Sequence, residues 1–350
     1  MIAIGHSGPR TSRSSLTAAA PARPRPPRFL AIVGPTGAGK TALSLRVARE
    51  LDGEIISMDS RQVYRGMDVG TDKVSARQRA LVPHHGLDIR DPGQRYSAGE
   101  FGRDARRWIG AIRSRGRVPV LAGGTGFFLR VLTDPIFREP PLDPARRDAL
   151  EAVLAALPRP EVERWVRALD PDRADLAIAG GCQRMLRTIT ITLLTGHGLS
   201  WWHHRHPTDA KALPGVVCVL DVPREVLDER IRRRIHDMVA GGFRDEVAGL
   251  LGAGHTRDDP GLNGVGYREM ADHLAGRITL EDAMERTRVA TRRYAKRQVT
   301  WFRHQLGPDA VTVDGTASAA AQQAAVVSAW RARRGESRAG AGGAVAEAAR

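Results

Sequence analysis

GPTGAGKT, residues 34–41, fits the pattern G-x-x-x-x-G-K-[ST] of a phosphate-binding loop, the P-loop. The apolar run FLAIV (29–33) before it predicts a buried strand, and TALSLRVAREL (41–51) after it has a helical pattern. Glycines in such a loop let backbone N–H groups turn inward, and the helix start adds positive potential. We therefore predict a phosphate site made of Gly34, Pro35, Thr36, Gly37, Ala38, Gly39, Lys40 and Thr41. Lys40 supplies a positive charge, and the Thr41 hydroxyl is the candidate Mg²⁺ ligand.

Three further apolar runs predict buried parallel strands at residues 54–58, 118–122 and 216–220. Helical patterns such as 101–115 separate these runs, and strands that alternate with helices indicate an α/β fold. We expect a parallel sheet like that of P-loop NTPases, with helices on both faces. Ligands gather at the carboxyl ends of such strands. Those ends carry, besides the P-loop, Asp59, Thr125 in GGTG, and Asp221.

The chain divides into five predicted segments. They are a disordered basic extension (1–28), the first part of the P-loop core (29–137), a helical insertion subdomain (138–210), the second part of the core with basic C-terminal helices (211–306) and a largely disordered tail (307–350). Of the net charge of +15, residues 1–28 carry +5 and residues 331–350 carry +3. Since much of the basicity lies at the two ends, the overall charge is weak evidence for a nucleic-acid partner.

Cysteine and hydropathy patterns exclude several protein classes. Cys182 and Cys218 lie far apart in the sequence, and this gives neither a metal-binding spacing nor a disulfide framework. No apolar run approaches the roughly 18 residues that cross a bilayer. We expect a cytoplasmic monomer with no membrane partner. His84 and His85 are expected to be structural residues rather than a metal pair.

The segment DSRQVYRGMDVGTDK (59–73) resembles the signature of the tRNA dimethylallyltransferases, the tRNA isopentenylating enzymes. Further matches to this family follow in chain order: PHHGLDIRDP (83–92), YSAGEF (96–101), VPVLAGGTGFFL (118–129), RIRRRIHDMVAGGFRDEV (230–247), GVGYREM (264–270) and TRRYAKRQVTWFR (291–303). Together these matches extend over most of residues 29–305. Such an ordered series is far more specific than any single motif.

The resemblance implies prenyl transfer. The P-loop would hold the pyrophosphate of dimethylallyl diphosphate with Mg²⁺, and the prenyl group would move to the N6 amine of the adenosine 3′-adjacent to the anticodon. By motif match, Asp59 is the base that takes the amine proton, and Thr125 is a hydrogen-bonding partner near the amine or the leaving phosphate. From the residues alone, Asp59 is a candidate Mg²⁺ ligand at a strand end and Thr125 a candidate helix cap. These alternatives stay open.

The resemblance also implies contacts with the anticodon stem-loop of tRNA. They fall on Asp59, Ser60, Arg61, Gln62, Arg147, Gln183, Arg184, Met185, Leu186, Arg187, Asn263, Gly264, Val265, Gly266, Tyr267 and Arg268. Residues 286–303 carry seven cations and no acid, which favours a surface that follows phosphates over a helix with merely solvated charges. Residues 180–182 are Gly-Gly-Cys where the family usually has Pro-Asn-Asp. We expect this departure to affect tRNA docking rather than chemistry.

Three other functions remain as alternatives. An adenylate prenyltransferase, which modifies AMP, ADP or ATP, would share the P-loop and Asp59 but would need no extended RNA surface. A nucleotide or small-molecule kinase would bind ATP at the P-loop and needs an arginine-rich lid beside a phosphoryl acceptor site. The sequence shows no convincing lid of this kind, although residues 230–234 could be mistaken for one. A non-enzymatic RNA-binding scaffold would have no use for an intact Lys40, Thr41 and Asp59.

Overall fold

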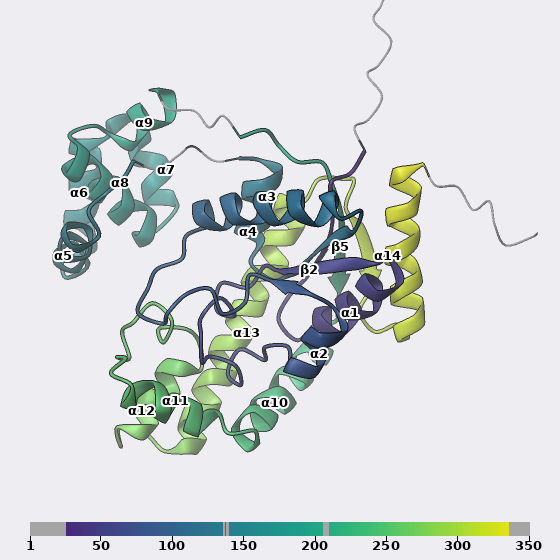
Figure 1. The fold of residues 1–350 in the computed structure, drawn as a ribbon. Helices are drawn as coiled ribbons and strands as arrows, with labels where there is room; N and C mark the ends of the chain where they lie inside the picture. The colour runs from purple at the N-terminus through teal and green to yellow at the C-terminus, as the bar shows by residue number, and fades with distance from the viewer. Residues whose placement is uncertain (1–25, 136, 138–139, 206–209, 336–350) are drawn as a thin grey trace, which may run out of the picture.

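The computed structural model describes residues 26–135, 137, 140–205 and 210–335 (Figure 1). All but the last three residues of the predicted extension 1–28 lie outside these ranges, and so do residues 336–350. Two connections join a small group of helices, on the left of Figure 1, to a larger body that contains the sheet. Among the described helices, none has both the length and the apolar character to span a membrane.

The core is one six-stranded sheet in which every neighbouring pair of strands is parallel. The strands are β1 (Phe29–Val33), β2 (Gly53–Ser57), β3 (His84–His85), β4 (Val118–Gly123), β5 (Gly215–Asp221) and β6 (Val311–Asp314), in the spatial order β3-β2-β4-β1-β5-β6. This confirms the predicted parallel α/β fold. The sequence predicted the four longer strands within one residue at each end. It missed β3, which has only two residues, and β6, which lies in the supposed tail.

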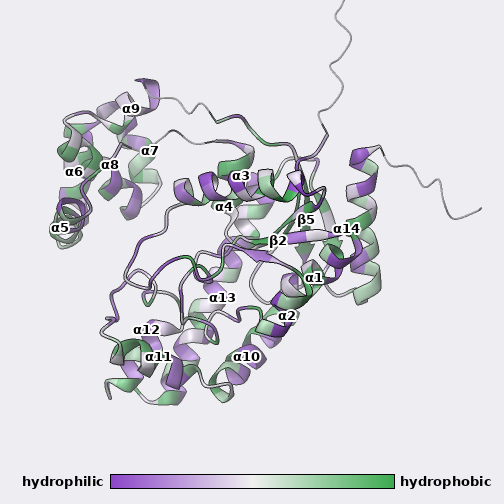
Figure 2. Cartoon of the chain, in the orientation of Figure 1, coloured by the Kyte–Doolittle hydropathy of each residue, from purple (hydrophilic) through white to green (hydrophobic). Residues whose placement is uncertain are grey.

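Helices cover both faces of the sheet. On one face, α1 (Lys40–Glu50) and α14 (Ala319–Arg334) pack Leu43, Val47 and Trp330 against the strands. The other face is covered by α3 (Ala98–Ser114), α4 (Gly126–Thr133) and the end of α13 (Leu280–Gln305). These helices carry hydrophobic and hydrophilic residues on different faces, as a helix against a sheet requires (Figure 2). The short α2 (Ala76–Leu81) leads into β3.

The tail prediction is wrong for residues 311–334. They form β6 at the edge of the sheet and α14 on its face, and Val326, Val327 and Trp330 are buried there. The sequence VTVD is too short and too exposed to predict a strand, and the alanine-rich α14 has a weak apolar stripe. Its few large apolar residues nevertheless lie at positions 326, 327 and 330, which share one face of a helix.

The segment between β4 and β5 forms a separate helical unit with its own core. Its helices are α5 (Pro144–Ala155), α6 (Arg159–Leu169), the 3₁₀ turn η1 (Pro171–Arg173), α7 (Ala174–Ala179), α8 (Cys182–Thr195) and α9 (Leu199–Arg205). Val162, Val166, Met185 and Ile189 are among its buried residues. It lies beside the sheet, at the left of Figure 1. We call it the insertion subdomain.

A third hydrophobic cluster lies at the carboxyl end of the strands. It joins the loop after β2 to α10 (Arg224–Ala240), α11 (Phe243–Gly252) and α12 (Tyr267–Leu274). Helix α13 runs from α12 back to the sheet (Figure 1). This helical group therefore encloses the sheet edge at which the P-loop and Asp59 lie.

Candidate active site

The P-loop connects β1 to α1 and is shaped by its glycines. Gly39 caps α1 with a φ of 90°, in the left-handed region that favours glycine. The ammonium of Lys40 donates a hydrogen bond of 2.6 Å to the carbonyl of Pro35. Burial lowers the pKa of Lys40 to about 8, and the neighbouring Asp59 opposes this shift. An incompletely compensated cation in a glycine-rich loop at the start of a helix is a site that an anion would complete.

Asp59 and Thr125 lie side by side at the ends of β2 and β4. One carboxylate oxygen of Asp59 accepts a hydrogen bond of 2.8 Å from the backbone N–H of Arg61. The Thr125 hydroxyl oxygen accepts one of 3.3 Å from the backbone N–H of Ser60. Thr125 does occupy the cap position of α4, but its side chain makes no capping hydrogen bond. The helix-cap alternative therefore does not explain this threonine.

Tyr294 of α13 completes this group. Burial and the nearby Asp59 carboxylate raise the pKa of its phenol, and hydrogen bonding to Thr125 acts in the opposite direction. The phenol therefore stays protonated and is available as a hydrogen-bond donor. One helix turn later, the amide of Gln298 accepts from the backbone N–H of Thr36 and donates to the carbonyl of Gly124, each at 2.9 Å.

Two cavities meet at Asp59. The first contains the phosphate-facing side chains Lys40 and Thr41 of the P-loop. The second, of about 300 Å³, is lined by Arg61, by residues 263–267 and by α13. Their shared wall consists of Thr36, Asp59, Thr71, Arg234 and Tyr294. A carboxylate at such a junction can touch one reactant from each side.

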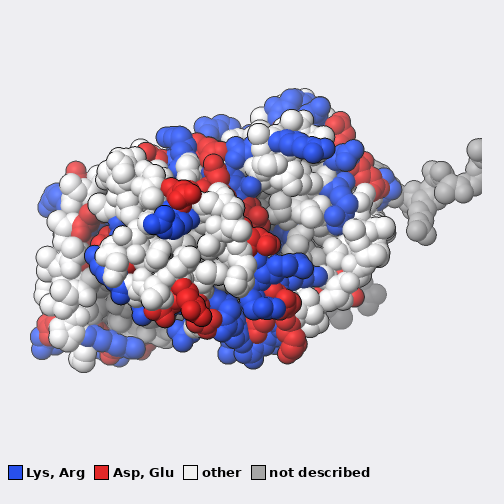
Figure 3. Space-filling view, turned by 90° about the horizontal axis from the view of Figure 1, so that it is seen from below, with Lys and Arg blue, Asp and Glu red and all other residues white. Residues whose placement is uncertain are grey.

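The P-loop also faces a wide outer chamber of about 820 Å³. On the face seen from below, Lys and Arg side chains border a recess right of centre (Figure 3). The basic residues that line the chamber are Lys40, Arg46, Lys73, Arg230, Arg233 and Arg234. Arg230 and Arg234 hold the loop directly, since they donate to the Gly37 carbonyl and to the Thr36 hydroxyl. The chamber is thus an electropositive approach to the phosphate site.

The first cavity also fits a magnesium ion. The Thr41 hydroxyl lines it together with the carboxylates of Asp59 and Asp72. Mg²⁺ is usually bound by one or two carboxylates and by phosphate oxygens of the substrate, rather than by a protein cage. The part of the chain that the structure describes contains no cluster of three or more His, Cys, Asp or Glu suited to a metal. His84 and His85 bond instead to the Val82 carbonyl and to Glu54.

Several residues expected to contact tRNA do line the second cavity. Asn263, Gly264, Val265 and Gly266 form one side, and Ser60 lies opposite. The Arg61 guanidinium donates to the carbonyls of Pro260 and Gly261, so it fixes this turn in place. Arg268 does not line the second cavity and pairs instead with Asp258 at 3.2 Å.

Three residues expected to contact tRNA are buried in this structure. Met185 and Leu186 are only 0% and 8% exposed, because QRMLR is helical and these two positions face the core of the insertion subdomain. Tyr267 is 1% exposed, and its hydroxyl donates to Glu246 at 2.7 Å. Its ring is therefore part of the third cluster rather than a stacking surface for a base. The Gln62 side chain, also expected to contact tRNA, is bonded within the protein. Its amide accepts from the Ser57 hydroxyl and donates to the carbonyls of Thr71 and Asp72.

The other predicted residues of the insertion subdomain stay accessible. Gln183 and Arg184 are exposed at the start of α8, and Arg187 lies over the Phe137 ring at 5.7 Å. Arg147 of α5 is half-buried, with its Nε 3.5 Å from Asp148. The Gly-Gly-Cys departure leaves α8 without a side-chain cap, since Gly181 occupies the cap position at a φ of 85°.

The basic surface of α13 is smaller than the sequence predicted. Arg288 pairs with Glu285 at 2.6 Å, and Arg292 pairs with Asp228 of α10 at 2.8 Å. The exposed cations that share one side of the helix are Arg286, Arg293 and Arg297. Arg297 also lines the second cavity and lies 5.8 Å from the Tyr294 ring.

The sequence prediction missed Arg234, Tyr294 and Gln298, which all line the first cavity. All three belong to segments that match the family, so the signal was present, but the sequence analysis placed none of them at the phosphate site. Asp221 shows the opposite case, because the sequence placed it at the site and the structure does not. It ends β5, where its partner is Asp314 of β6, and it lines none of the three cavities.

Comparison with known proteins agrees with this geometry. A family model described as IPP transferase matches residues 62–305, and one described as isopentenyl transferase matches residues 27–79. A tRNA dimethylallyltransferase of Anaeromyxobacter sp. (strain K) is 42% identical over 80% of this chain and 91% of its own length. One of Bordetella petrii is also 42% identical, over 82% and 92%.

Solved structures give the same answer. The tRNA isopentenylpyrophosphate transferase of Bacillus halodurans aligns with a TM-score of 0.62 and 34% identity, over 87% of this chain and 97% of its own. A eukaryotic dimethylallyltransferase acting on tRNA aligns with a TM-score of 0.69 and 27% identity, over 82% and 74%. The chain belongs to the IPP transferase family, that of the tRNA dimethylallyltransferases.

Proposed function

We propose that the chain transfers the dimethylallyl group of dimethylallyl diphosphate to the N6 amine of the adenosine 3′-adjacent to the anticodon of tRNA, with release of pyrophosphate. The observation that carries this proposal is the position of Asp59. It lies where a phosphate cavity built on the P-loop meets a cavity built on the turn 263–267. Both reactants can therefore reach the same carboxylate from opposite sides.

On the donor side, the bond between the prenyl carbon and the diphosphate oxygen breaks, and the electron pair leaves with pyrophosphate. The growing charge is met by the P-loop N–H groups, by Lys40 and by Arg234, whose positions are fixed before the reaction. The Thr41 hydroxyl and a carboxylate would hold Mg²⁺, which when bound would supply further charge neutralisation for the leaving group. The Lys40 pKa of about 8 keeps its ammonium largely protonated at neutral pH.

On the acceptor side, the N6 amine is a poor nucleophile because its lone pair is delocalised into the adenine ring. As the new bond between N6 and the prenyl carbon forms, a proton must leave the nitrogen. Asp59 is placed to accept it, and positioned acid–base groups typically contribute about 10²–10⁴-fold to a rate. Thr125 and Tyr294 flank the carboxylate and orient the reacting groups.

The target adenosine reaches this buried point only if it leaves its stack, as in other base-modifying enzymes. The second cavity would receive the base. The exposed cations of α13 and the accessible Arg184 and Gln183 would hold the anticodon stem-loop through its phosphates. We propose that the protein acts as a monomer and in the cytoplasm, where tRNA is found.

The direct test is labelling of substrate. The protein is incubated with Mg²⁺ and dimethylallyl diphosphate labelled in the prenyl group, together with unmodified tRNA or with AMP. Label in tRNA at a single adenosine supports the proposal, and label in AMP alone would indicate an adenylate prenyltransferase. Transfer of γ-phosphate from ATP with no prenyl transfer would indicate a kinase. Light scattering of the same sample gives the number of chains.

A further inference from the structure

The loop of residues 68–72, here called the wall loop, borders all three cavities of the site. Thr71 and Asp72 line the phosphate cavity, and Gly70 and Thr71 line the cavity of the turn 263–267. Asp68, Val69 and Asp72 line the outer chamber. A shift of this one loop would change the shape of the site on both sides of Asp59.

The wall loop is not held by its own backbone preferences. Asp72 has a φ of 53°, in the left-handed region that residues with a side chain rarely adopt. Such a conformation persists only where surrounding contacts impose it. The loop's internal hydrogen bonds, such as that from the Asp72 N–H to the Val69 carbonyl, are few. Other parts of the fold must therefore hold it.

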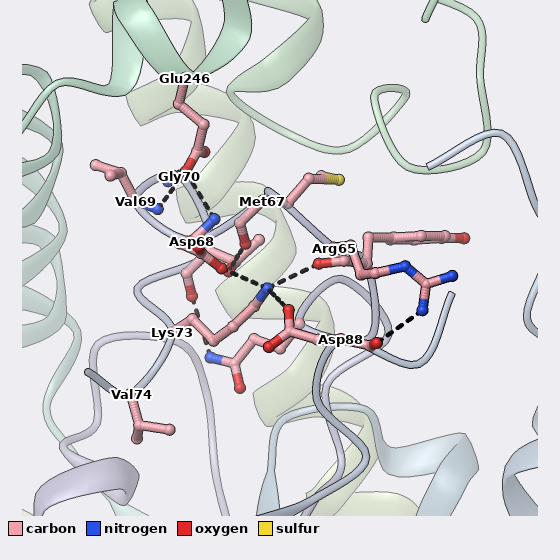
Figure 4. A network of polar contacts seen from close by, with 12 residues as sticks. Arg65, Met67, Asp68, Val69, Gly70, Lys73, Val74, Asp88 and Glu246 are labelled. Carbon is pink, nitrogen blue, oxygen red and sulfur yellow. Dashed lines mark hydrogen bonds and ion pairs between the residues drawn. The ribbon is translucent and has the colours of Figure 1, made fainter. Parts of the chain in front are cut away.

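Glu246 of α11 provides one anchor. Its carboxylate accepts three backbone hydrogen bonds from the wall loop, from Asp68 at 2.7 Å, Val69 at 2.6 Å and Gly70 at 3.1 Å. The Tyr267 hydroxyl donates a fourth, at 2.7 Å. Figure 4 shows the Glu246 side chain extending from its helix onto these amides. Four donors thus converge on one carboxylate.

Lys73 provides a second anchor at the other end of the loop. Its side chain is 0% exposed, and its ammonium contacts the carboxylates of Asp68 and Asp88 at 2.6 Å each and the Tyr64 carbonyl at 2.7 Å (Figure 4). The loop backbone also packs tightly against rings, because a Cβ on Gly70 would lie 2.2 Å from Phe243 and 2.7 Å from Tyr267. The loop backbone is therefore in close van der Waals contact with α11 and α12.

The wall loop in turn holds a residue of the diphosphate site. The Arg234 guanidinium donates to the Thr71 carbonyl at 3.3 Å and lies 3.7 Å from the Asp72 carboxylate. Its other nitrogen donates to the Thr36 hydroxyl of the P-loop at 3.2 Å. A chain of contacts therefore runs from Glu246 through the wall loop to Arg234 and the P-loop.

We propose that Glu246 is a positioning residue for the diphosphate: it seats the wall loop, and the loop sets Arg234 and Asp72 toward the P-loop. The inference rests on the proposed function, in which this cavity holds the diphosphate donor. Glu246 does not line any of the three cavities. Its effect on the reaction must therefore pass through the loop and Tyr267. The larger effect should fall on donor binding, because the charged groups that the loop positions, Arg234 and Asp72, lie toward the P-loop.

The test is Glu246→Gln. A glutamine keeps the length of the side chain but offers one acceptor oxygen, and its NH₂ group faces amides that are themselves donors. Loop donors left without an acceptor are costly, so we expect the dissociation constant of inorganic pyrophosphate with Mg²⁺, measured by calorimetry without tRNA, to rise about tenfold or more. The KM for dimethylallyl diphosphate should rise in parallel, while the KM for tRNA stays within about twofold of wild type.

Gly70→Ala is the second variant, in case Glu246→Gln folds poorly. It lifts the same loop by a steric clash with Phe243 and should give the same rise for pyrophosphate. Asp245→Asn is the matched control, because this exposed carboxylate in the same helical turn pairs with Arg244, lies on no cavity wall of the described residues and should behave as wild type. Normal pyrophosphate affinity in both loop variants, or an equal loss of pyrophosphate and tRNA affinity, would overturn the inference. Absence of tRNA prenylation by the wild type would instead count against the proposed function alone.

Discussion

The side-chain oxygen of Gln298 lies 2.9 Å from the backbone nitrogen of Thr36 and accepts its hydrogen bond, so helix α13 is joined directly to the P-loop. One turn earlier on the same helix, Tyr294 lies beside Asp59 and Thr125. Arg297, between them in sequence, faces the second cavity. A single rigid helix therefore carries contacts to the donor loop, to the reacting centre and to the RNA side of the site.

Gln298→Leu should weaken both the fold and donor binding. The residue is 6% exposed, and leucine leaves the Thr36 N–H and the Gly124 carbonyl without partners. Each such group costs about 1–3 kcal/mol when it is buried. Denaturant unfolding should show this loss, and the affinity for dimethylallyl diphosphate should fall. Thr300→Ala, exposed on the same helix, is the control. Unchanged stability and affinity would mean that the bridge is dispensable.

Lys40→Met should make the protein more stable while it removes activity. The pKa of Lys40 falls from 10.5 unfolded to about 8 folded, so burial of its charged form costs about 3 kcal/mol at pH 7. Between pH 8 and 10.5 the unfolded chain holds a proton that the folded chain lacks, so this cost is fully present below pH 8 and disappears as pH rises. Methionine keeps the stem and removes the charge.

The measurement for Lys40→Met is the free energy of unfolding at pH 7 and pH 10, without diphosphate. The free energy of unfolding of the variant should exceed that of wild type most at pH 7 and little at pH 10. Lys211→Met, at an exposed lysine, is the control. Diphosphate binding should be lost while tRNA affinity stays nearly unchanged. Lost tRNA affinity with normal diphosphate binding would contradict the placement of Lys40.

The salt dependence of tRNA binding should separate the free cations of α13 from the paired one. Arg293 and Arg297 are exposed, so their replacement by glutamine should reduce the log–log slope by about 0.7–0.9 for each lost phosphate contact. Arg292 is held by Asp228, and Arg292→Gln should change the slope less. Affinity is measured by filter binding across a salt series. An unchanged slope in the double variant would make these residues an ordinary solvated face.

Truncations should show where the folded chain ends. A protein of residues 26–335 keeps every residue of the site, and its kcat/KM should stay within about tenfold of full length, roughly 1.4 kcal/mol. Removal of residues 307–350 exposes the sheet face that α14 covers and should prevent folding.

Trp330→Ala, at a residue 2% exposed, should cost about 3–5 kcal/mol of stability by denaturant unfolding. A stable protein that ends at residue 306 would contradict the packing of α14.

The donor half of the site is predictable from sequence because its parts follow apolar strands directly. The P-loop follows β1, and Asp59 lies just beyond β2, so local pattern and the rule for parallel strands bring them together. Gln298 and Glu246 are different. They bond partners 262 and 176 residues away, and no local pattern specifies such pairs. Met185 shows the reverse error, since its motif match predicts an RNA contact but the period of its helix buries it.

Asp59→Asn should separate the two roles that the carboxylate can have. Asparagine keeps the size of the side chain and an oxygen that can accept from the Arg61 N–H, but it cannot take a proton from the amine. If Asp59 is the base, dimethylallyl diphosphate and tRNA should still bind, and kcat should fall by about two to four orders of magnitude. If Asp59 is mainly a Mg²⁺ ligand beside Thr41, the variant should need more Mg²⁺, and excess Mg²⁺ should restore much of the rate.

The measurement is single-turnover prenylation at saturating tRNA across a Mg²⁺ titration, with wild type in parallel. We expect no rescue, because Asp59 lies on the wall shared with the second cavity, within reach of the acceptor. Recovery to a near wild-type rate would leave the amine proton to water or to the departing pyrophosphate.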